Sequence, residues 1–166
     1  MHEDRTRPGP SPSPPEPAPE VAACGFYLVP RPGGFVLHMS TSPEHLQTMR
    51  AQVFKTVTGA GVDEEIADAA RLVASELVGN AVRLCGPWTP VVVQVVTGAG
   101  RVLVRVHDPE PAAVPSRRDE RPDNAVSESG RGLWIVDMLA PGWTVEPTPV
   151  GKQITCALPL PERAAA

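Results

Sequence analysis

The spacing of apolar residues predicts two long helices in the first half of the chain. The first begins at Ser42-Pro43, where serine suits the N-cap and proline suits the first helical position. It is expected over 43–58, and its apolar positions recur every three or four residues: Leu46, Met49, Val53 and Val57. The second runs from the capping residue Asp63 to about Cys85. Its apolar stripe comprises Ala67, Ala70, Val73, Leu77, Ala81 and Leu84.

Short strands surround these helices and come in pairs. The pairs are expected over 25–29 and 34–39, over 90–96 and 101–107, and over 143–146 and 153–158. Each pair is joined by a turn that contains glycine, and a short helix over 133–139 precedes the last pair. Because hairpins alternate with helices, the sheet should be mixed or antiparallel with helices on one face. The prediction is an α+β fold, a two-layer α/β sandwich.

Three segments lack an apolar period. Residues 1–24 begin with seven prolines in 20 positions, which predicts a disordered tail without a binding role. Residues 161–166 are read as a C-terminal tail, so the folded domain is expected over 25–160. Residues 109–129 contain four prolines and a run of charges. A loop of about 20 residues inside a compact domain is usually functional, often a lid.

Composition narrows the class of protein. The 166 residues fit one domain, and 42% hydrophobic residues can build a core although only 4% are aromatic. A net charge of −4 without a basic cluster argues against a nucleic-acid surface. Three cysteines without a CxxC spacing argue against a disulfide framework or a zinc site. No signal peptide and no long apolar run is seen, so we expect a cytoplasmic protein that does not bind membranes.

A polar stripe interrupts the second helix. Glu76, Asn80 and Arg83 stand at positions i, i+4 and i+7, so they share one side of the helix. Mg²⁺ with a phosphate would satisfy such a stripe, with Asn80 as an oxygen ligand and Glu76 as a general base. An equally simple interpretation is a solvent-facing Glu76–Arg83 pair beside an Asn80 without a role.

A glycine-flanked segment, Gly130-Arg131-Gly132-Leu133, follows the long loop and opens the short helix. The free N–H groups of a helix N-terminus bind phosphate, and Arg131 can add a charge-assisted contact. Without a ligand, the same residues would only be the end of a flexible loop.

Two further polar residues stand near strand ends. Asp108 can accept a hydrogen bond from an exocyclic amine, or it can cap the turn that begins at Pro109, which is the commoner role. Lys152 follows Gly151 in a turn, and we interpret it as an ordinary surface lysine.

In their order along the chain these pieces resemble the GHKL superfamily of ATP-binding domains, the Bergerat fold. The resemblance covers about residues 25–160 and is greatest to the single-domain anti-sigma-factor serine kinases of actinobacteria. Residues 76–82 resemble the family's N-box, and Asp108 falls at its first glycine-box aspartate. Residues 130–136 resemble the second glycine box, and Gly151-Lys152-Gln153-Ile154 falls at the last box.

The resemblance implies ATP and Mg²⁺ as cofactors. Asn80 would hold Mg²⁺, Glu76 would activate a serine hydroxyl of a protein substrate, and Asp108 would bind the adenine amine. Residues 109–129 would form the ATP lid. The remaining nucleotide-binding positions would be Arg83, Gly130, Arg131, Gly132, Leu133 and Gln153. The implied partners are a sigma factor and an anti-sigma antagonist protein, and relatives of this type are often homodimers.

The chain also departs from the family pattern. Glu110 and Ala112 stand where glycines usually follow the aspartate, and Gln153 stands where a threonine near adenine is usual. Two hypotheses follow: an ATP-dependent protein serine kinase that binds a sigma factor, or a non-catalytic partner-binding module on a degenerate ATPase scaffold. A sensor-kinase catalytic domain is a third alternative, ranked lowest because the chain has no phosphoacceptor helix.

Overall fold

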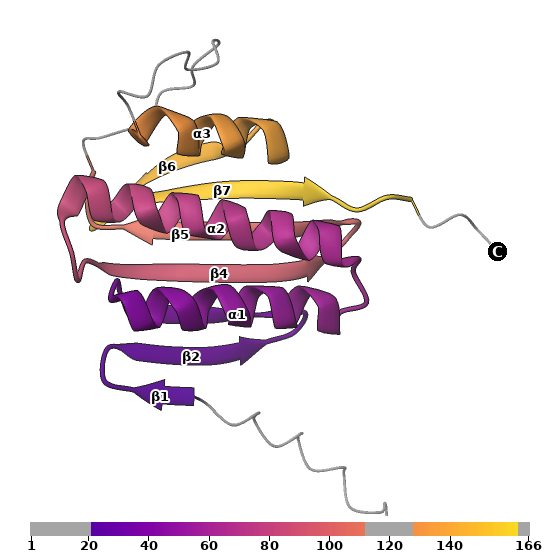
Figure 1. Ribbon diagram of the computed structural model, residues 1–166, viewed down its shortest axis with the longest axis horizontal. Helices are drawn as coiled ribbons and strands as arrows, with labels where there is room; N and C mark the ends of the chain where they lie inside the picture. Colours follow the sequence, from indigo (N-terminus) through magenta and orange to yellow (C-terminus); the bar gives the residue numbers. More distant parts are fainter. Residues whose placement is uncertain (1–20, 112–127, 163–166) are drawn as a thin grey trace, which may run out of the picture.

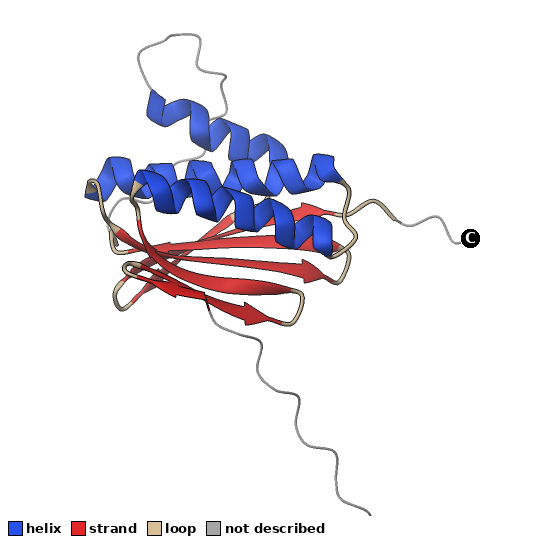
Figure 2. Ribbon diagram, turned by 60° about the horizontal axis from the view of Figure 1, so that its bottom comes forward, coloured by secondary structure: helices blue, strands red, loops and turns tan. Residues whose placement is uncertain are grey.

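The computed structural model describes residues 21–111 and 128–162. These residues form a seven-stranded sheet in the order β1-β2-β3-β4-β5-β7-β6, in which every neighbouring pair is antiparallel. Three helices cover one face of the sheet and leave the other open (Figures 1 and 2). The α+β two-layer prediction is therefore confirmed, and the sheet is antiparallel rather than mixed. The strands are β1 (Val21–Ala23), β2 (Phe26–Arg31), β3 (Gly34–Ser40), β4 (Pro90–Gly98), β5 (Arg101–Asp108), β6 (Thr144–Thr148) and β7 (Gly151–Pro159), and the helices are α1 (Pro43–Gly59), α2 (Glu64–Cys85) and α3 (Glu128–Leu139).

Both long helices start where their capping residues predict. The Ser42 side chain accepts a hydrogen bond from the backbone N–H of His45 at 3.1 Å, and Pro43 occupies the first turn of α1. Asp63 is the N-cap of α2, without a side-chain hydrogen bond to the helix. The apolar stripes of both helices face the sheet, so the period of 3.6 residues correctly indicated their buried sides. Leu84 is the exception: it was predicted in the stripe of the second helix but is 43% exposed, because it lies in the last turn of α2.

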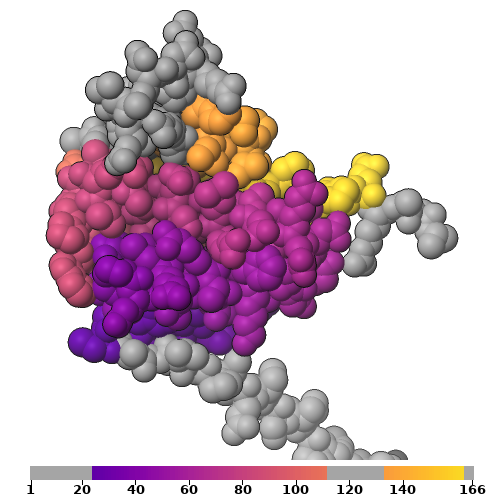
Figure 3. All heavy atoms as spheres, viewed as in Figure 1, coloured from indigo at the N-terminus to yellow at the C-terminus, as the bar shows by residue number. Residues whose placement is uncertain are grey.

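The core lies between the helices and one face of the sheet. Alternate residues of each central strand point into it, because successive side chains of a strand lie on opposite faces. The buried strand residues include Phe35, Leu37, Met39, Val91, Val93, Val95, Val102, Val104, Val106, Ile154, Cys156 and Leu158. The helices pack side by side over them, with α1 and α2 forming one continuous surface and α3 beside α2 (Figure 3). Aliphatic side chains thus form most of the core, as the scarcity of aromatic residues predicts.

The structure differs from the predicted boundaries in two places. Val21–Ala23 form the edge strand β1 paired with β2, so the expectation of a disordered tail through residue 24 is wrong for these residues. Helix α3 begins at Glu128, five residues earlier than predicted. Gly130 and Gly132 therefore lie within its first turns. The rest of the predicted tails and of the lid, residues 1–20, 112–127 and 163–166, lies outside the described residues.

Within the described residues, no helix has the length and apolar character needed to cross a membrane.

Candidate functional site

The two flanks of α2 face different helices. On one flank, Arg50 of α1 donates a hydrogen bond from Nε to Ser75 Oγ at 3.0 Å. On the other flank, Ala69 and Leu72 line a cavity of about 430 Å³ together with Leu139 at the end of α3. Counting four residues along the helix from Leu72 gives Glu76, and four more give Asn80. Glu76 and Asn80 therefore continue the flank of α2 that faces α3.

Helices α2 and α3 run antiparallel. Leu72, in the first half of α2, lies near Leu139 at the C-terminal end of α3. The second half of α2, which carries Glu76 and Asn80, therefore runs beside the N-terminal half of α3, as Figure 1 shows. Gly130 and Gly132 belong to that half of α3. The fold thus brings two segments about fifty residues apart, the polar stripe and the glycine-flanked segment, to one end of the molecule.

Asn80 is the most deeply buried member of the polar stripe, with 7% of its surface exposed. Its carboxamide makes no hydrogen bond to any of the described residues. Glu76 is half-buried and Arg83 is exposed, with its Nη1 atom folded back toward Gly79. No ion pair joins Glu76 to Arg83 in the described part of the chain. The interpretation of this stripe as a solvent-facing ion pair is therefore not what the structure shows.

These residues fit a magnesium ion that is bound mainly through phosphate. The amide oxygen of Asn80 is a neutral oxygen ligand of the kind that a Mg²⁺ ion accepts. Mg²⁺ commonly uses one or two protein oxygens, several waters and substrate phosphates. Nowhere in the described ranges do three or more His, Cys, Asp or Glu side chains cluster as a complete protein cage would require. Asn80 can hold the ion, and half-buried Glu76 stands one helical turn away from it.

A buried ion pair closes the same end of the sheet. Asp108 ends β5 and Lys152 is its cross-strand neighbour on β7. Both side chains are 1% exposed, and Nζ of Lys152 lies 2.8 Å from Oδ1 of Asp108. The interpretation of Lys152 as a surface lysine is therefore wrong. A signal was present in the sequence, because Lys152 shares the strand alternation of Ile154, Cys156 and Leu158, all of which are buried.

The residues after Asp108 are fixed by the same pair. The backbone N–H of Glu110 donates to Oδ1 of Asp108 at 2.9 Å, and Nζ of Lys152 donates to the Glu110 carbonyl oxygen at 2.8 Å. Asp108 therefore does cap the turn at Pro109, as its commoner role predicts. Its second oxygen, Oδ2, accepts no hydrogen bond from the described residues. Asp108 thus caps the turn through Oδ1, while Oδ2 has no hydrogen bond from the described residues, in a side chain that is 1% exposed.

The C-terminus of α2 reaches this ion pair. Burial raises the pKa of the Cys85 thiol above its ordinary value. The charge of Asp108 raises it further, that of Lys152 lowers it, and that of Glu110 raises it. Such effects need proximity, so the last turn of α2 lies close to the ends of β5 and β7. The polar stripe, the ion pair and the start of α3 consequently surround one region of the helix-covered face.

Gln153 does not join this region. It pairs with His107 on β5 and Glu146 on β6, and its alternation places it on the open face of the sheet. The side chain of Leu133 is half-buried on α3, while the side chain of Arg131 is outside the described set. Binding of a nucleotide by Gln153 would therefore need contact from the opposite side of the sheet.

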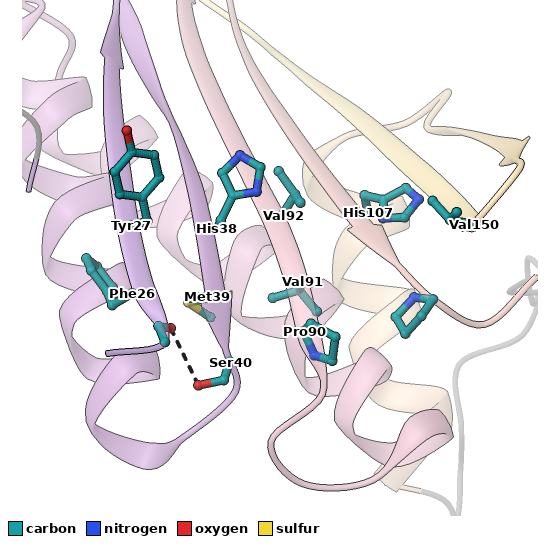
Figure 4. A pocket seen from close by; sticks show the side chains of 12 residues that line it. Phe26, Tyr27, His38, Met39, Ser40, Pro90, Val91, Val92, His107 and Val150 are labelled. Carbon is teal, nitrogen blue, oxygen red and sulfur yellow. Dashed lines mark hydrogen bonds between the residues drawn. The ribbon is translucent and has the colours of Figure 1, made fainter. Parts of the chain in front are cut away.

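The open face carries a separate shallow cavity of about 590 Å³. Tyr27, His38, Val92 and His107 cross it as one row on four neighbouring strands, with Val150 at its end (Figure 4). The His107 ring is held by a 2.8 Å hydrogen bond between Nε2 and Thr148 Oγ1. The row is mostly apolar and aromatic and lies on the other side of the sheet from Asn80 and Asp108.

One comparison with known protein families gives a match. The model of one family, described as histidine kinase-like ATPase domain, matches residues 39–158, which is more than half of the chain. This range contains the three helices and the strands β4, β5 and β6, with nearly all of β7. No curated protein matches the chain significantly.

Proposed function

Because this chain belongs to the histidine kinase-like ATPase domain family, we propose that it binds ATP with Mg²⁺ between α2, α3 and the ends of β5 and β7. One observation carries the proposal. Asn80, a polar residue that is only 7% exposed, stands beside Glu76 on the flank of α2 that faces α3. An amide oxygen and a carboxylate one helical turn apart suit a Mg²⁺ ion that is bound mainly through phosphate.

Each part of the region has a distinct role in this proposal. Asn80 holds the metal ion, and Oδ2 of Asp108 accepts a hydrogen bond from the adenine amine. The backbone amides at the start of α3, up to Gly130, bind the phosphates, because the first N–H groups of a helix lack intrahelical partners. Gly132, one turn later, leaves room for the phosphates to come close to the helix. Arg83 and Arg131 add positive charge, and Leu133 contributes apolar contact. The metal ion, when bound, neutralises charge on the phosphates.

We further propose that the protein transfers the γ-phosphoryl group to a serine of an anti-sigma antagonist protein. The family includes anti-sigma factor serine kinases. Glu76 accepts the proton of the serine hydroxyl while the serine oxygen bonds to the γ-phosphorus. The bond from that phosphorus to the bridging oxygen breaks, and ADP leaves. Phosphoryl transfer depends on positioning and charge stabilisation more than on covalent catalysis, so these few residues are sufficient.

A second candidate function is a non-catalytic module that binds a sigma factor or its antagonist. Two observations favour it. Glu110 stands where the family pattern has a glycine, and Gln153 lies on the open face instead of near the ion pair. Both changes weaken the case for turnover, although neither removes Asn80 or Glu76.

Two measurements separate these functions. Calorimetry of the full chain with ATP, with and without Mg²⁺, tests binding, and we expect micromolar affinity that depends on the metal ion. A phosphotransfer assay with the antagonist protein then compares the wild type with Glu76→Ala. Removal of a general base should lower the rate at least about 100-fold while ATP affinity stays within about threefold. ATP binding without transfer would favour the non-catalytic module, and no binding at millimolar ATP would refute both the nucleotide site and the kinase.

A further inference from the structure

The buried pair of Lys152 and Asp108 has consequences for ligand selection that the family pattern does not explain. The chain has two lysines, Lys55 and Lys152, and the side chain of Lys152 is 1% exposed. A buried ammonium group is costly unless its hydrogen bonds are satisfied. Here two of its three donors are used, one by Asp108 Oδ1 and one by the Glu110 carbonyl oxygen, each at 2.8 Å. Lys152 therefore has a defined structural task at this site.

The first part of that task is to fix the strand end after Asp108. Glu110 and Ala112 replace two glycines of the family pattern, and Pro109 and Pro111 flank Glu110. Lys152 holds the Glu110 carbonyl oxygen while Asp108 holds the Glu110 N–H. Both backbone groups of Glu110 are thus bonded within one buried cluster. The lysine supplies a rigid anchor where glycines would otherwise give the backbone its freedom.

The second part concerns the carboxylate itself. Oδ1 of Asp108 already accepts from Lys152 and from Glu110 N–H, so it has little capacity for a third donor. Oδ2 is the oxygen that remains for a ligand. An ionised carboxylate is a hydrogen-bond acceptor on both oxygens. Such a group accepts the amine of adenine and repels the carbonyl oxygen that hypoxanthine carries at the same ring position.

We propose that Lys152 is a positioning residue that determines nucleobase selectivity, by orienting Asp108 so that Oδ2 alone faces a ligand amine. This inference rests on the proposed nucleotide site and names what sets its preference. Lys152 is given no contact with the base in this proposal, because two of its three donors already hold the 108–110 segment. It acts through Asp108.

The test compares ATP and inosine triphosphate by calorimetry in the presence of Mg²⁺. The wild type should bind ATP at least about tenfold more tightly than the inosine nucleotide. Lys152→Met keeps much of the side-chain volume and removes the ammonium group. This variant should bind ATP at least about tenfold more weakly than the wild type does. Its affinities for ATP and for inosine triphosphate should be nearly equal. Lys55→Met removes a lysine on the exposed side of α1 and should change neither value.

A second variant covers the case in which Lys152→Met does not fold. The double variant Asp108→Asn with Lys152→Met removes both buried charges, and such replacements are often tolerated. A neutral amide can present either its oxygen or its NH₂ group to a base, so the double variant should also lose the preference for ATP. If either folded variant prefers ATP over inosine triphosphate as strongly as the wild type does, the proposed role of Lys152 is overturned. If the wild type binds neither nucleotide, the proposed function fails and this inference fails with it; normal wild-type selectivity that survives both variants refutes the inference alone.

Discussion

Gly151 is the residue whose replacement should be most damaging at the candidate site. It begins β7 directly beside the end of β5, with a φ of 144° that L-amino acids rarely adopt. A Cβ atom at this position would overlap the backbone carbonyl oxygen of Asp108 and lie 2.8 Å from the Cα atom of Pro109. Both neighbours are backbone atoms and cannot rotate away. Gly151→Ala therefore forces the two strands apart at the Asp108–Lys152 pair.

The expected loss of stability follows from two terms. A residue held in a sparsely populated backbone region costs about 1–3 kcal/mol. Separation of the strands also weakens the buried Asp108–Lys152 pair, and complete loss of one partner of such a pair costs about 3–5 kcal/mol. Because the pair should be weakened rather than abolished, we expect Gly151→Ala to lower the free energy of unfolding by about 3 kcal/mol. For a domain of this size that corresponds to a fall in Tm of about 10 °C.

Thermal and urea unfolding, followed by circular dichroism, measure this change. Gly98→Ala is the matched control, because Gly98 also stands at a strand end but a Cβ there would meet no atom within 4 Å. The control should stay within about 0.5 kcal/mol of the wild type. A difference in Tm of less than about 3 °C between Gly151→Ala and the control would be no larger than the effect of an ordinary surface substitution. Such a result would refute the predicted clash between a Cβ atom at position 151 and the backbone of Asp108 and Pro109.

Three further changes test other parts of the structure. Asn80→Ala should abolish the Mg²⁺ dependence of ATP binding measured by calorimetry, and an unchanged difference between Mg²⁺ and EDTA would contradict the metal role. Burial raises the pKa of the Cys156 thiol to about 12, from an ordinary value of 9.0, so Ellman's reagent at pH 8 should label exposed Cys24 and Cys85 and reach Cys156 only on unfolding. Because the pKa of Cys156 is higher in the folded state, the stability that the protonated thiol contributes is complete below pH 9 and is lost as the pH rises toward 12. Unfolding curves of the wild type and of Cys156→Ala at alkaline pH test this loss. Gly59→Ala, in the last turn of α1 with open space around the added methyl group, should raise the free energy of unfolding by about 0.5–1 kcal/mol in urea titrations.

Short-range patterns in the sequence predicted most of the secondary structure. The helices at 43–58 and 63–85 appear as α1 and α2 with nearly the same bounds, because capping residues and a 3.6-residue period are local properties. The three hairpins were likewise indicated by glycine turns between β-rich segments. The spacing of Glu76 and Asn80 placed both on one side of α2 before any tertiary contact was considered.

The start of α3 was harder to predict. The residues before Gly132 include serine, glutamate and glycine, which have no strong apolar period, so the sequence indicated a loop up to that point. In the structure the helix already begins at Glu128. Its described buried residue Val136 packs in the core, and Trp143 after the helix donates a 2.6 Å hydrogen bond from Nε1 to Asp137 Oδ1. Tertiary contacts of this kind fix a helix whose first turns have weak local signals.

The sequence by itself determined which segments form helices and hairpins and which polar residues lie one helical turn apart, because these depend on neighbours within a few residues. Only the tertiary structure decided that β7 lies between β5 and β6, which makes Lys152 the partner of Asp108 and turns Gln153 to the open face. A strand has two faces that alternate at every residue, and which one is buried depends on the layer packed against it. The charge pair at the candidate site therefore arises from strand register between residues more than forty positions apart.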